Sequence, residues 1–381
     1  MKKVVFVIFS LFLVVESNAQ IKKYIRSKDS TDITFTGTKL NPYAQEFDTS
    51  GKVIFSAYFD SYFSAYSDSV NGNGFVKFPT IAPRSKQFGL NIIQVSAKYL
   101  SPNFRGTATI FGGDCPLSAW SPILNFVQEA NAGFRVVKNV WIDAGFFRTH
   151  FGLESIQPRE NMTMSLATTT YFEPYFLSGA KLTWQLNSHF ALQANIFNSF
   201  NQFTETNRNK ALGMSFAYTN GDKFSLTYSN IFCDESAPIS GQWRQYHNLI
   251  SVFKTTHHVL GCEVNFGGQK GTAISSNYAM MFSSLLAYKY RITPQIAVYG
   301  RGEFFSDPKE ILTGPVYNDN HNLVGLNVYG GTFGAEYKPI PNSYFRIEGR
   351  LLNEYRDKIF YVSGNPSNQR YELIVGLGLW F

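Results

Sequence analysis

Charged side chains recur at every second position in three short stretches of the C-terminal third of the chain. Residues 301–303 read RGE, residues 346–350 read RIEGR and residues 370–372 read RYE. Alternate side chains of an extended strand point to the same face, so each stretch presents its charges on one face. Such a face could set an electric field across a water-filled pore, or it could form cross-strand ion pairs that neutralise one another. Arginines outnumber glutamates here, which would give a pore a mild preference for anions; both interpretations remain open.

Catalytic and metal chemistry have little support in the sequence. The six histidines are scattered, and the chain contains no GxSxG, HExxH, GxGxxG or P-loop motif. His150 and Asp143 fall on one expected strand, but nothing singles out a nucleophile beside them. We therefore expect no catalytic residue, no metal and no cofactor.

Cysteine usage and charge distribution exclude two further classes. Cys115, Cys233 and Cys262 form an odd set without a CxxC motif, which argues against a disulfide framework and a zinc site. Cys115 and Cys233 fall in expected loops and could pair only if those loops meet. The net charge of +7 is spread thinly, without a block of Lys or Arg, so nucleic acid is not an expected partner.

The elements that must position these side chains are β-strands, because period-two alternation runs through the chain from Gly51 onward. The clearest unit reads ALGMSFAYT over residues 211–219 and KFSLTYS over residues 223–229. Asn220-Gly221 between them favours a tight hairpin, since both residues tolerate positive φ. A soluble sandwich also alternates in this way, so the periodicity alone does not decide the fold.

Counting such segments predicts sixteen strands. Their expected bounds are residues 51–66, 86–100, 103–113, 123–136, 139–150, 175–187, 189–200, 210–219, 223–232, 244–255, 258–268, 278–291, 295–306, 325–338, 343–355 and 370–381. Short turns alternate with long connections along this series, and aromatic residues flank the short turns. These features are typical of an all-β, transmembrane, antiparallel up-and-down β-barrel with short periplasmic turns and long extracellular loops. An even strand count returns both ends of the barrel to the periplasm.

The N-terminal residues predict the compartment. Lys2 and Lys3 precede an apolar run over residues 4–15, and Ser17-Asn18-Ala19 offers the small residues that a signal peptidase reads. We expect residues 1–19 to be a cleaved signal peptide, residues 20–50 a polar periplasmic tail and residues 51–381 the barrel. Aromatic residues make up 17% of the chain and charged residues only 16%, which suits a protein that meets both lipid and water.

The strand positions that alternate with the apolar ones point to the other face of the sheet, and these positions predict the pore lining. An Arg or Lys side chain on the lipid face would cost about 2–4 kcal/mol at the bilayer midplane, so the charges should face an aqueous lumen. The expected pore-lining charges are Arg105, Glu129, Arg135, Lys181, Glu263, Arg301, Glu303, Arg346, Glu348, Arg350, Arg370 and Glu372. The longest connection, residues 151–174, is the third long one. By analogy with general porins it could fold inward as a constriction that carries Glu154, Arg159 and Glu160, or it could stay on the surface.

Several stretches resemble a known family. FDSYFSAYS (residues 59–67), FGLNIIQVS (88–96), VQEANAGFRV (127–136) and DAGFFRTHFGLES (143–155) resemble the putative β-barrel porin-2 family, best over about residues 53–183. The last stretch, with Tyr371, Leu379 and the terminal Phe381 on one face, resembles the C-terminal signal by which outer-membrane barrels are recognised for assembly. The resemblance implies a porin-like barrel more firmly than it implies a solute.

The sequence therefore predicts an outer-membrane porin for passive diffusion of small hydrophilic solutes. The alternatives are a barrel enzyme that hydrolyses lipid or peptide at the outer rim, and a structural or adhesive barrel plugged by its loops. The expected partners are outer-membrane lipid, the barrel assembly machinery and the solutes. Many porins are homotrimers, but no interface signature is readable here, so the oligomeric state stays open.

Overall fold

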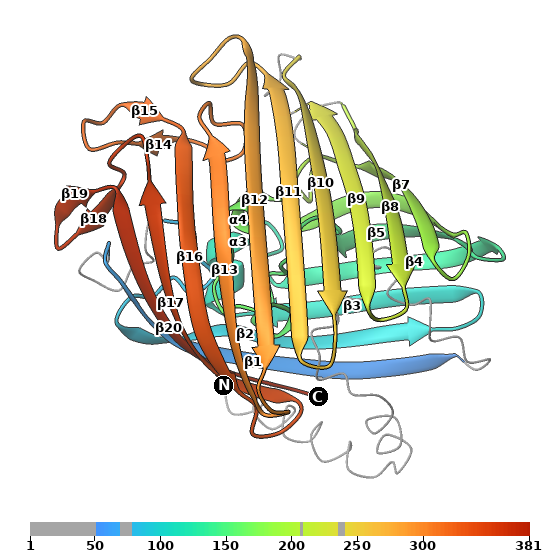
Figure 1. Cartoon of the computed structure of the whole chain (residues 1–381). Helices are drawn as coiled ribbons and strands as arrows, with labels where there is room; N and C mark the ends of the chain where they lie inside the picture. The colour runs from blue at the N-terminus through green and yellow to red at the C-terminus, as the bar shows by residue number, and fades with distance from the viewer. Residues whose placement is uncertain (1–50, 69–77, 206–208, 235–240) are drawn as a thin grey trace, which may run out of the picture. The chain divides into compact units, whose positions relative to one another are not determined.

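The computed structural model describes residues 51–68, 78–205, 209–234 and 241–381, all in the larger of two compact units (Figure 1). Most of them lie in sixteen long strands. These are β1 (Lys52–Tyr66), β2 (Gln87–Leu100), β3 (Phe104–Gly112), β4 (Val127–Val137), β5 (Val140–Arg148), β6 (Phe176–Gln185), β7 (Phe190–Phe197), β8 (Ala211–Asn220), β9 (Phe224–Asp234), β10 (Trp243–Lys254), β11 (His258–Lys270), β12 (Tyr278–Arg291), β13 (Ile296–Asp307), β16 (Leu326–Tyr337), β17 (Ser343–Glu354) and β20 (Gln369–Trp380).

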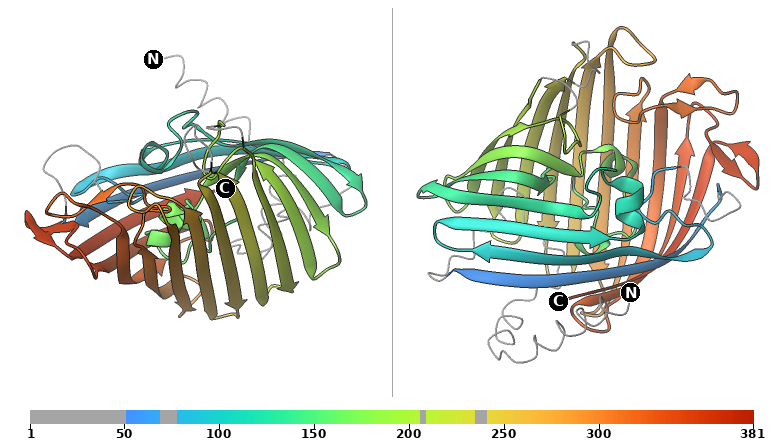
Figure 2. Two further views of the ribbon diagram at one scale, coloured as in Figure 1. Left: turned by 90° about the horizontal axis from the view of Figure 1, so that it is seen from above. Right: turned by 180° about the vertical axis from the view of Figure 1, so that it is seen from behind.

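The sixteen strands form one closed antiparallel barrel in chain order, which is sealed where β20 pairs with β1 (Figures 1 and 2). The seam runs in register from Tyr58 opposite Trp380 to Tyr66 opposite Glu372. At its end Phe381 N–H donates to Ala57 O, and Ala57 N–H donates to Phe381 O, each at 3.1 Å. Closure leaves no free strand edge, as a sheet in hydrocarbon requires. The predicted sixteen-stranded barrel is confirmed.

The two faces of the barrel differ sharply in chemistry. On β17 the apolar side chains of Phe345, Ile347 and Leu351 are 42–47% exposed, whereas the charged residues between them are at most 5% exposed. The same alternation recurs on β20, where Leu373 and Leu377 face outward and Glu372 faces inward. An apolar outer band around a closed barrel is the surface that a bilayer accepts, and it leaves the charges in the lumen.

The connections add short elements that the sequence did not predict. Between β3 and β4 lies α3 (Asp114–Ala119), and between β5 and β6 lie the 3-10 turn η2 (Pro158–Glu160) and α4 (Thr168–Phe172). Two small hairpins extend later connections, and they consist of β14 (Val316–Tyr317) with β15 (Leu323–Val324), and β18 (Phe360–Val362) with β19 (Asn365–Ser367). These helices and hairpins are too short to form a periodic sequence pattern, so the sequence predicts only connections at these positions.

Two expectations concern residues before the barrel. The signal peptide (residues 1–19) and the periplasmic tail (residues 20–50) lie outside the described residues and stay predictions. Within the described residues, no helix is both long enough and apolar enough to cross a membrane.

Part of the barrel interior is filled by hydrophobic side chains near the long connections. Trp120 packs edge-on against Phe111 at 5.1 Å between ring centroids and against Phe176 at 4.6 Å. Cys115 is buried in the same cluster as a free thiol, so the pairing of Cys115 with Cys233 does not form. These packed groups fill part of the barrel interior beside the connections.

Removal of Phe381 tests the seam. Deletion of this residue removes a pair of backbone hydrogen bonds at the closing edge together with the terminal aromatic ring. We expect the inserted, protease-resistant fraction in outer-membrane preparations to fall far more than the loss of one half-exposed side chain would explain. Phe381→Tyr keeps both the backbone pair and the ring and should insert normally. Equal insertion of the deleted chain would contradict a role in closure and assembly.

Candidate functional site

The candidate site is the barrel lumen together with residues 149–175, the connection between β5 and β6, which we call the strap. Residues 151–158 and 161–170 of the strap are all buried, although connections normally run over a protein surface. The left view of Figure 2, seen from above, shows green backbone of the strap between the walls of the barrel. Its contacts are with side chains of the lumen face, so the connection folds inward rather than lying on the surface.

Carboxylates of the wall hold the backbone of the strap. Leu153 N–H donates to Glu263 on β11 at 2.7 Å, and Thr168 N–H donates to Glu303 on β13 at 2.7 Å. Glu348 on β17 accepts two consecutive strap amides, from residues 164 and 165, at 2.5 and 2.9 Å. Hydrogen bonds to a charged acceptor are roughly twice as strong as neutral ones. These bonds provide hydrogen-bond partners for backbone amides of the strap, which does not pair with a neighbouring strand.

Arg346 on β17 holds the strap through its carbonyl groups. Its guanidinium donates to Pro158 O at 2.8 Å, to Asn161 O at 3.0 Å and to Thr163 O at 3.0 Å. The Nε of the same group pairs with Glu336 on β16 at 2.7 Å. The wall therefore binds the donors of the strap with glutamates and its acceptors with an arginine.

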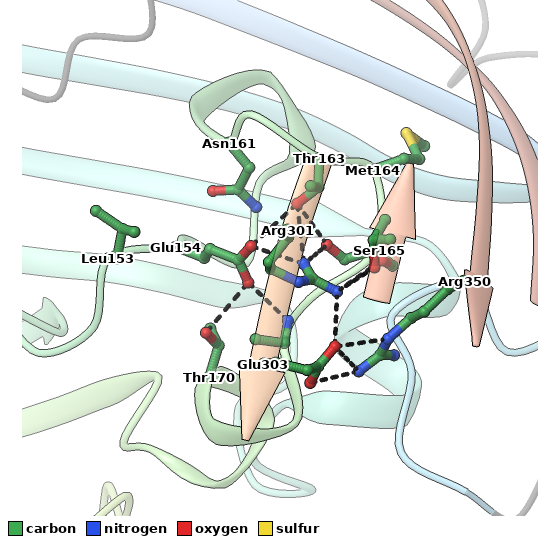
Figure 3. A network of polar contacts seen from close by, with 12 residues as sticks. Leu153, Glu154, Asn161, Thr163, Met164, Ser165, Thr170, Arg301, Glu303 and Arg350 are labelled. Carbon is green, nitrogen blue, oxygen red and sulfur yellow. Dashed lines mark hydrogen bonds and ion pairs between the residues drawn. The ribbon is translucent and has the colours of Figure 1, made fainter. Parts of the chain in front are cut away.

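Arg301 on β13 joins the strap side chains to the wall (Figure 3). It pairs with Glu154 at 2.7 Å and donates to Thr163 Oγ1 at 2.9 Å and to Ser165 O at 2.8 Å. Glu303, two residues along the same strand, pairs with Arg301 at 3.3 Å. All five residues are buried, so these charges are neutralised by one another rather than by water.

The charged network continues around the wall to the seam. Arg350 on β17 contacts Glu303 at 2.9 Å and Glu372 on β20 at 3.2 Å. Arg370 on β20 pairs with Glu372 and, through Nε, with Asp68 at 2.8 Å. Five of the lumen charges predicted on β13, β17 and β20 thus form one ion-paired cluster: Arg301, Glu303, Arg350, Arg370 and Glu372. Arg346 pairs instead with Glu336, and Glu348 accepts strap amides.

Apolar strap side chains lie over wall glycines. A Cβ added to Gly376 on β20 would lie 2.3 Å from Met164 Cε, and one added to Gly261 on β11 would lie 2.8 Å from Leu153. Only glycine leaves room for these side chains at the two positions. The strap is therefore located by close packing as well as by charge.

The far end of the strap reaches the opposite wall. Gln157 Nε2 donates to Gln94 on β2 at 2.6 Å and to Gln128 on β4 at 3.0 Å. The guanidinium of Arg159 lies 4.7 Å from the ring centroid of Tyr58 on β1. The strap consequently crosses the lumen from the β10–β20 wall to the β1–β4 wall.

Glu160, in the same part of the strap, forms an ion pair with Arg148, the last residue of β5. Arg148 Nη1 donates to Glu160 Oε1 at 2.9 Å, and a second contact joins the same two groups. Burial alone would raise the pKa of the Glu160 carboxyl, but Arg148 and then Arg159 lower that pKa to about 2. The ion pair therefore stabilises the strap fully at pH values above the ordinary carboxyl range, and this stability is lost as the pH falls towards 2.

Two predicted lumen cations lie on the wall away from the strap cluster. Arg105 on β3 binds Asp143 on β5, with Nε 2.6 Å from Oδ1, and stacks 4.4 Å from the Trp141 ring centroid. Lys181 on β6 lies 4.1 Å from the ring centroid of Phe147. No carboxylate within ion-pair distance of Lys181 is found in the described part of the chain.

Glu129 and Arg135, both on β4, are half-buried and lie apart from the strap cluster. Glu129 Oε1 accepts the backbone N–H of Arg148 at 3.4 Å. Arg135 donates to Asn103 Oδ1 at 3.2 Å beside the short β2–β3 turn. These two predicted residues therefore face the lumen without joining its central network.

Sequence reasoning missed two groups of buried polar residues. Glu336 bridges Arg346 and Lys289, with Lys289 Nζ at 2.6 Å. Asp60 accepts hydrogen bonds from Tyr58 at 3.1 Å and from Tyr344. Parity assigns each of them to the lumen face, but parity does not say which lumen residues meet.

Catalytic geometry does not form around the one pair that the sequence suggested. Asp143 is engaged by Arg105, and His150 packs against Phe151 at 4.4 Å between ring centroids. Among the described residues, no three His, Cys, Asp or Glu side chains gather as they would around a metal ion.

The comparisons with known proteins agree with this geometry. Residues 52–381 match the family described as putative beta-barrel porin-2, OmpL-like. No curated protein matches the chain. Solved structures of several outer-membrane proteins share its fold at low identity, and three of them are compared below.

The outer-membrane channel DcaP of Acinetobacter baumannii is 10% identical, covers 88% of this chain and 99% of its own, and gives a TM-score of 0.58. The anion-selective porin of Comamonas acidovorans is 10% identical, with 87% and 100% coverage and a TM-score of 0.57. OmpT of Vibrio cholerae is 9% identical, with 88% and 99% coverage and a TM-score of 0.57. At these identities the likeness shows the fold alone. The family match over nearly the whole barrel shows more, and the chain belongs to the putative beta-barrel porin-2, OmpL-like family.

Proposed function

We propose that this protein is a porin of the outer membrane through which small hydrophilic solutes diffuse passively. One observation carries the proposal: a closed sixteen-stranded barrel turns an apolar face outward and a charged, polar face inward. A barrel of this size is wide enough for an aqueous channel. Membership of a porin family and the porin-like fold support the same reading. Outer-membrane lipid and the assembly machinery are then required partners, and a homotrimer remains open.

The strap is the element that narrows this channel in our proposal. It crosses the lumen and is held by Glu154, Arg159 and Glu160 at its own side and by wall charges at the other. Diffusion would then be limited to the space that the strap and the packed aromatic clusters leave. The role of the strap is thus to set the size limit for solutes.

In this proposal the mild anion preference comes from different residues than the charge count suggests. Arg346 and Arg350 are matched by Glu336, Glu303 and Glu372, so their field is largely cancelled. Lys181 and Arg159 are lumen cations with no ion pair among the described residues. We assign the preference to these two.

Planar bilayer recording tests the proposed function. Purified protein should give stable, ohmic conductance in KCl, because an open lumen conducts without gating energy. A barrel that inserts but stays silent would contradict the porin and favour a plugged structural barrel. Hydrolysis of lipid or peptide by the silent barrel would instead favour an enzyme at the outer rim.

Glu348→Gln tests the strap. The substitution removes a charge that accepts two strap amides, each hydrogen bond to a charged group being worth about 1.5–3 kcal/mol. The detached strap should become roughly tenfold or more populated, and single-channel current should rise and become noisier. Asp222→Asn, at the exposed turn between β8 and β9, is the matched control. Unchanged currents in both variants would show that the strap does not set the conductance.

Selectivity is tested by neutralising the two unpaired cations. Lys181→Gln combined with Arg159→Gln should shift the reversal potential in a KCl gradient towards the equilibrium potential of K⁺. The reason is that the lumen loses two positive charges. Lys223→Gln, at an exposed turn, should leave the potential unchanged. If the double variant keeps the wild-type potential, these residues do not set the field.

A further inference from the structure

An exposed lysine lies between two aromatic side chains on the outer face of the barrel, at the end that carries the long connections. Lys270 is the last residue of β11 and lies opposite Tyr278, the first residue of β12. On its other side, Arg244 pairs with Gln269, so Trp243 at the start of β10 reaches the level of Lys270. Figure 1 shows these three strands side by side. One level of the wall therefore presents an aromatic, a cationic and a second aromatic side chain.

The two aromatic side chains mark the level of the lipid headgroups. Trp243 and Tyr278 are 52% and 51% exposed, and the same outer face below them exposes apolar side chains such as Met280 and Val264. Aromatic residues at the ends of barrel strands gather where hydrocarbon gives way to headgroups. Lys270 is an even number of residues from Val264 along β11, so its exposed side chain also leaves the outer face. The ammonium group of this lysine is therefore placed at headgroup level.

A cleft of about 670 Å³ opens beside this lysine. One side is formed by Gly241 and Gln242, which precede β10, and the other by residues 270–276, which end β11 and begin the connection to β12. Every residue of this lining is at least partly exposed. A ligand can therefore reach the cleft from the surface of the barrel without crossing the packed interior.

Hydrogen bonds fix the shape of the β11–β12 connection. Thr272 N–H donates to Ser275 O at 2.7 Å, and Ser275 N–H donates in return to Thr272 Oγ1 at 3.1 Å. Gln269 Nε2 donates to Gly271 O at 2.8 Å. Gly271, at φ +76°, lies in the left-handed region that favours glycine and turns the chain away from β11. The wall of the cleft is therefore formed by the fold itself, before any ligand binds.

The chemistry of the lining suits a phosphate group. Among the described residues that line the cleft, Lys270 is the one charged side chain, and none is a carboxylate. The polar side chains of the lining are those of Gln242, Thr272, Ser275 and Ser276. A phosphate carries negative charge and several acceptor oxygens, so an ammonium group together with N–H and O–H donors binds it well. An apolar molecule would leave these donors without a partner.

We propose that this cleft binds the phosphate-bearing headgroup of a lipid of the outer membrane. Lys270 pairs with the phosphate, and the acyl chains continue along the exposed apolar side chains of β10 to β12, over Leu249, Val264 and Phe282. Basic sites at a membrane surface favour anionic headgroups in this way. The bilayer holds a lipid at this level, so its headgroup meets the cleft at a high effective concentration that a free phosphate ion lacks. The inference rests on the outer-membrane location in the proposed function and needs no open channel.

Native mass spectrometry of the whole protein in detergent micelles tests the proposal. Phosphatidylglycerol and a diacylglycerol with the same acyl chains are added in equal amounts. Only the first carries a phosphate, so its adduct should be several-fold more abundant, and equal adducts would overturn the phosphate assignment. An excess of inorganic phosphate should leave most of the phosphatidylglycerol bound, because the micelle holds the lipid near the cleft. Complete displacement would assign the cleft to a free anion and overturn the lipid assignment.

Substitutions at the cleft complete the test. Lys270→Gln should lower the phosphatidylglycerol adduct several-fold, whereas Lys270→Arg keeps the positive charge and should keep the adduct. Gln242→Glu leaves the lysine in place but should also weaken binding, because a carboxylate beside the cleft repels the phosphate. Lys309→Gln, at an exposed position of the β13–β16 connection, is the matched control and should bind the lipid like the wild type. Wild-type binding by both Lys270→Gln and Gln242→Glu would overturn the site.

The two proposals fail separately. A wild-type protein that is silent in KCl refutes the porin, whereas its lipid adducts are measured without any conductance. Wild-type phosphatidylglycerol binding by the cleft variants refutes the lipid site alone.

Discussion

The structure depends on one constraint: a backbone amide or carbonyl group removed from water must still find a hydrogen-bond partner. In the wall this is met by the ladder of sixteen strands and by the seam between β1 and β20. The strap has no ladder, yet it crosses the interior. Its amides and carbonyls are satisfied by Glu263, Glu303, Glu348 and Arg346 of the wall. The charged side chains of the lumen in this sense supply the hydrogen-bond partners that an irregular segment cannot find within itself.

The balance of charges follows from the same arrangement. Counting along β13, β17 and β20 suggests an excess of arginine, but the strap brings Glu154 and β16 brings Glu336. Each buried charge thus has a partner of opposite sign. This pairing offsets the desolvation penalty that an unpaired buried charge would carry. The wall away from the strap carries fewer charges and more small neutral groups.

Sequence reasoning predicted the barrel well because its signals are local. Period-two alternation and Asn220-Gly221 predict strands and a turn within a few residues, and the structure confirms both. The partner of a lumen charge depends on register and on a distant segment, so neither Glu336 beside Arg346 nor Tyr344 beside Asp60 could be read from the chain. The helices of the strap are too short to leave a periodic pattern, and the path of the strap is determined by contacts with strands that come much later in the sequence.

That order along the chain has a consequence for biogenesis. Residues 149–175 are synthesised before every wall residue from β10 to β20 that holds them, and Met164 lies 184 residues before Glu348. Contacts this distant in sequence form late, because the intervening chain must first be brought together. The nascent barrel must therefore carry an unsatisfied strap until its final hairpin arrives. Pairing of β20 with β1 and the final ordering of the strap then occur together. An incomplete chain would therefore lack both a closed wall and an ordered lumen.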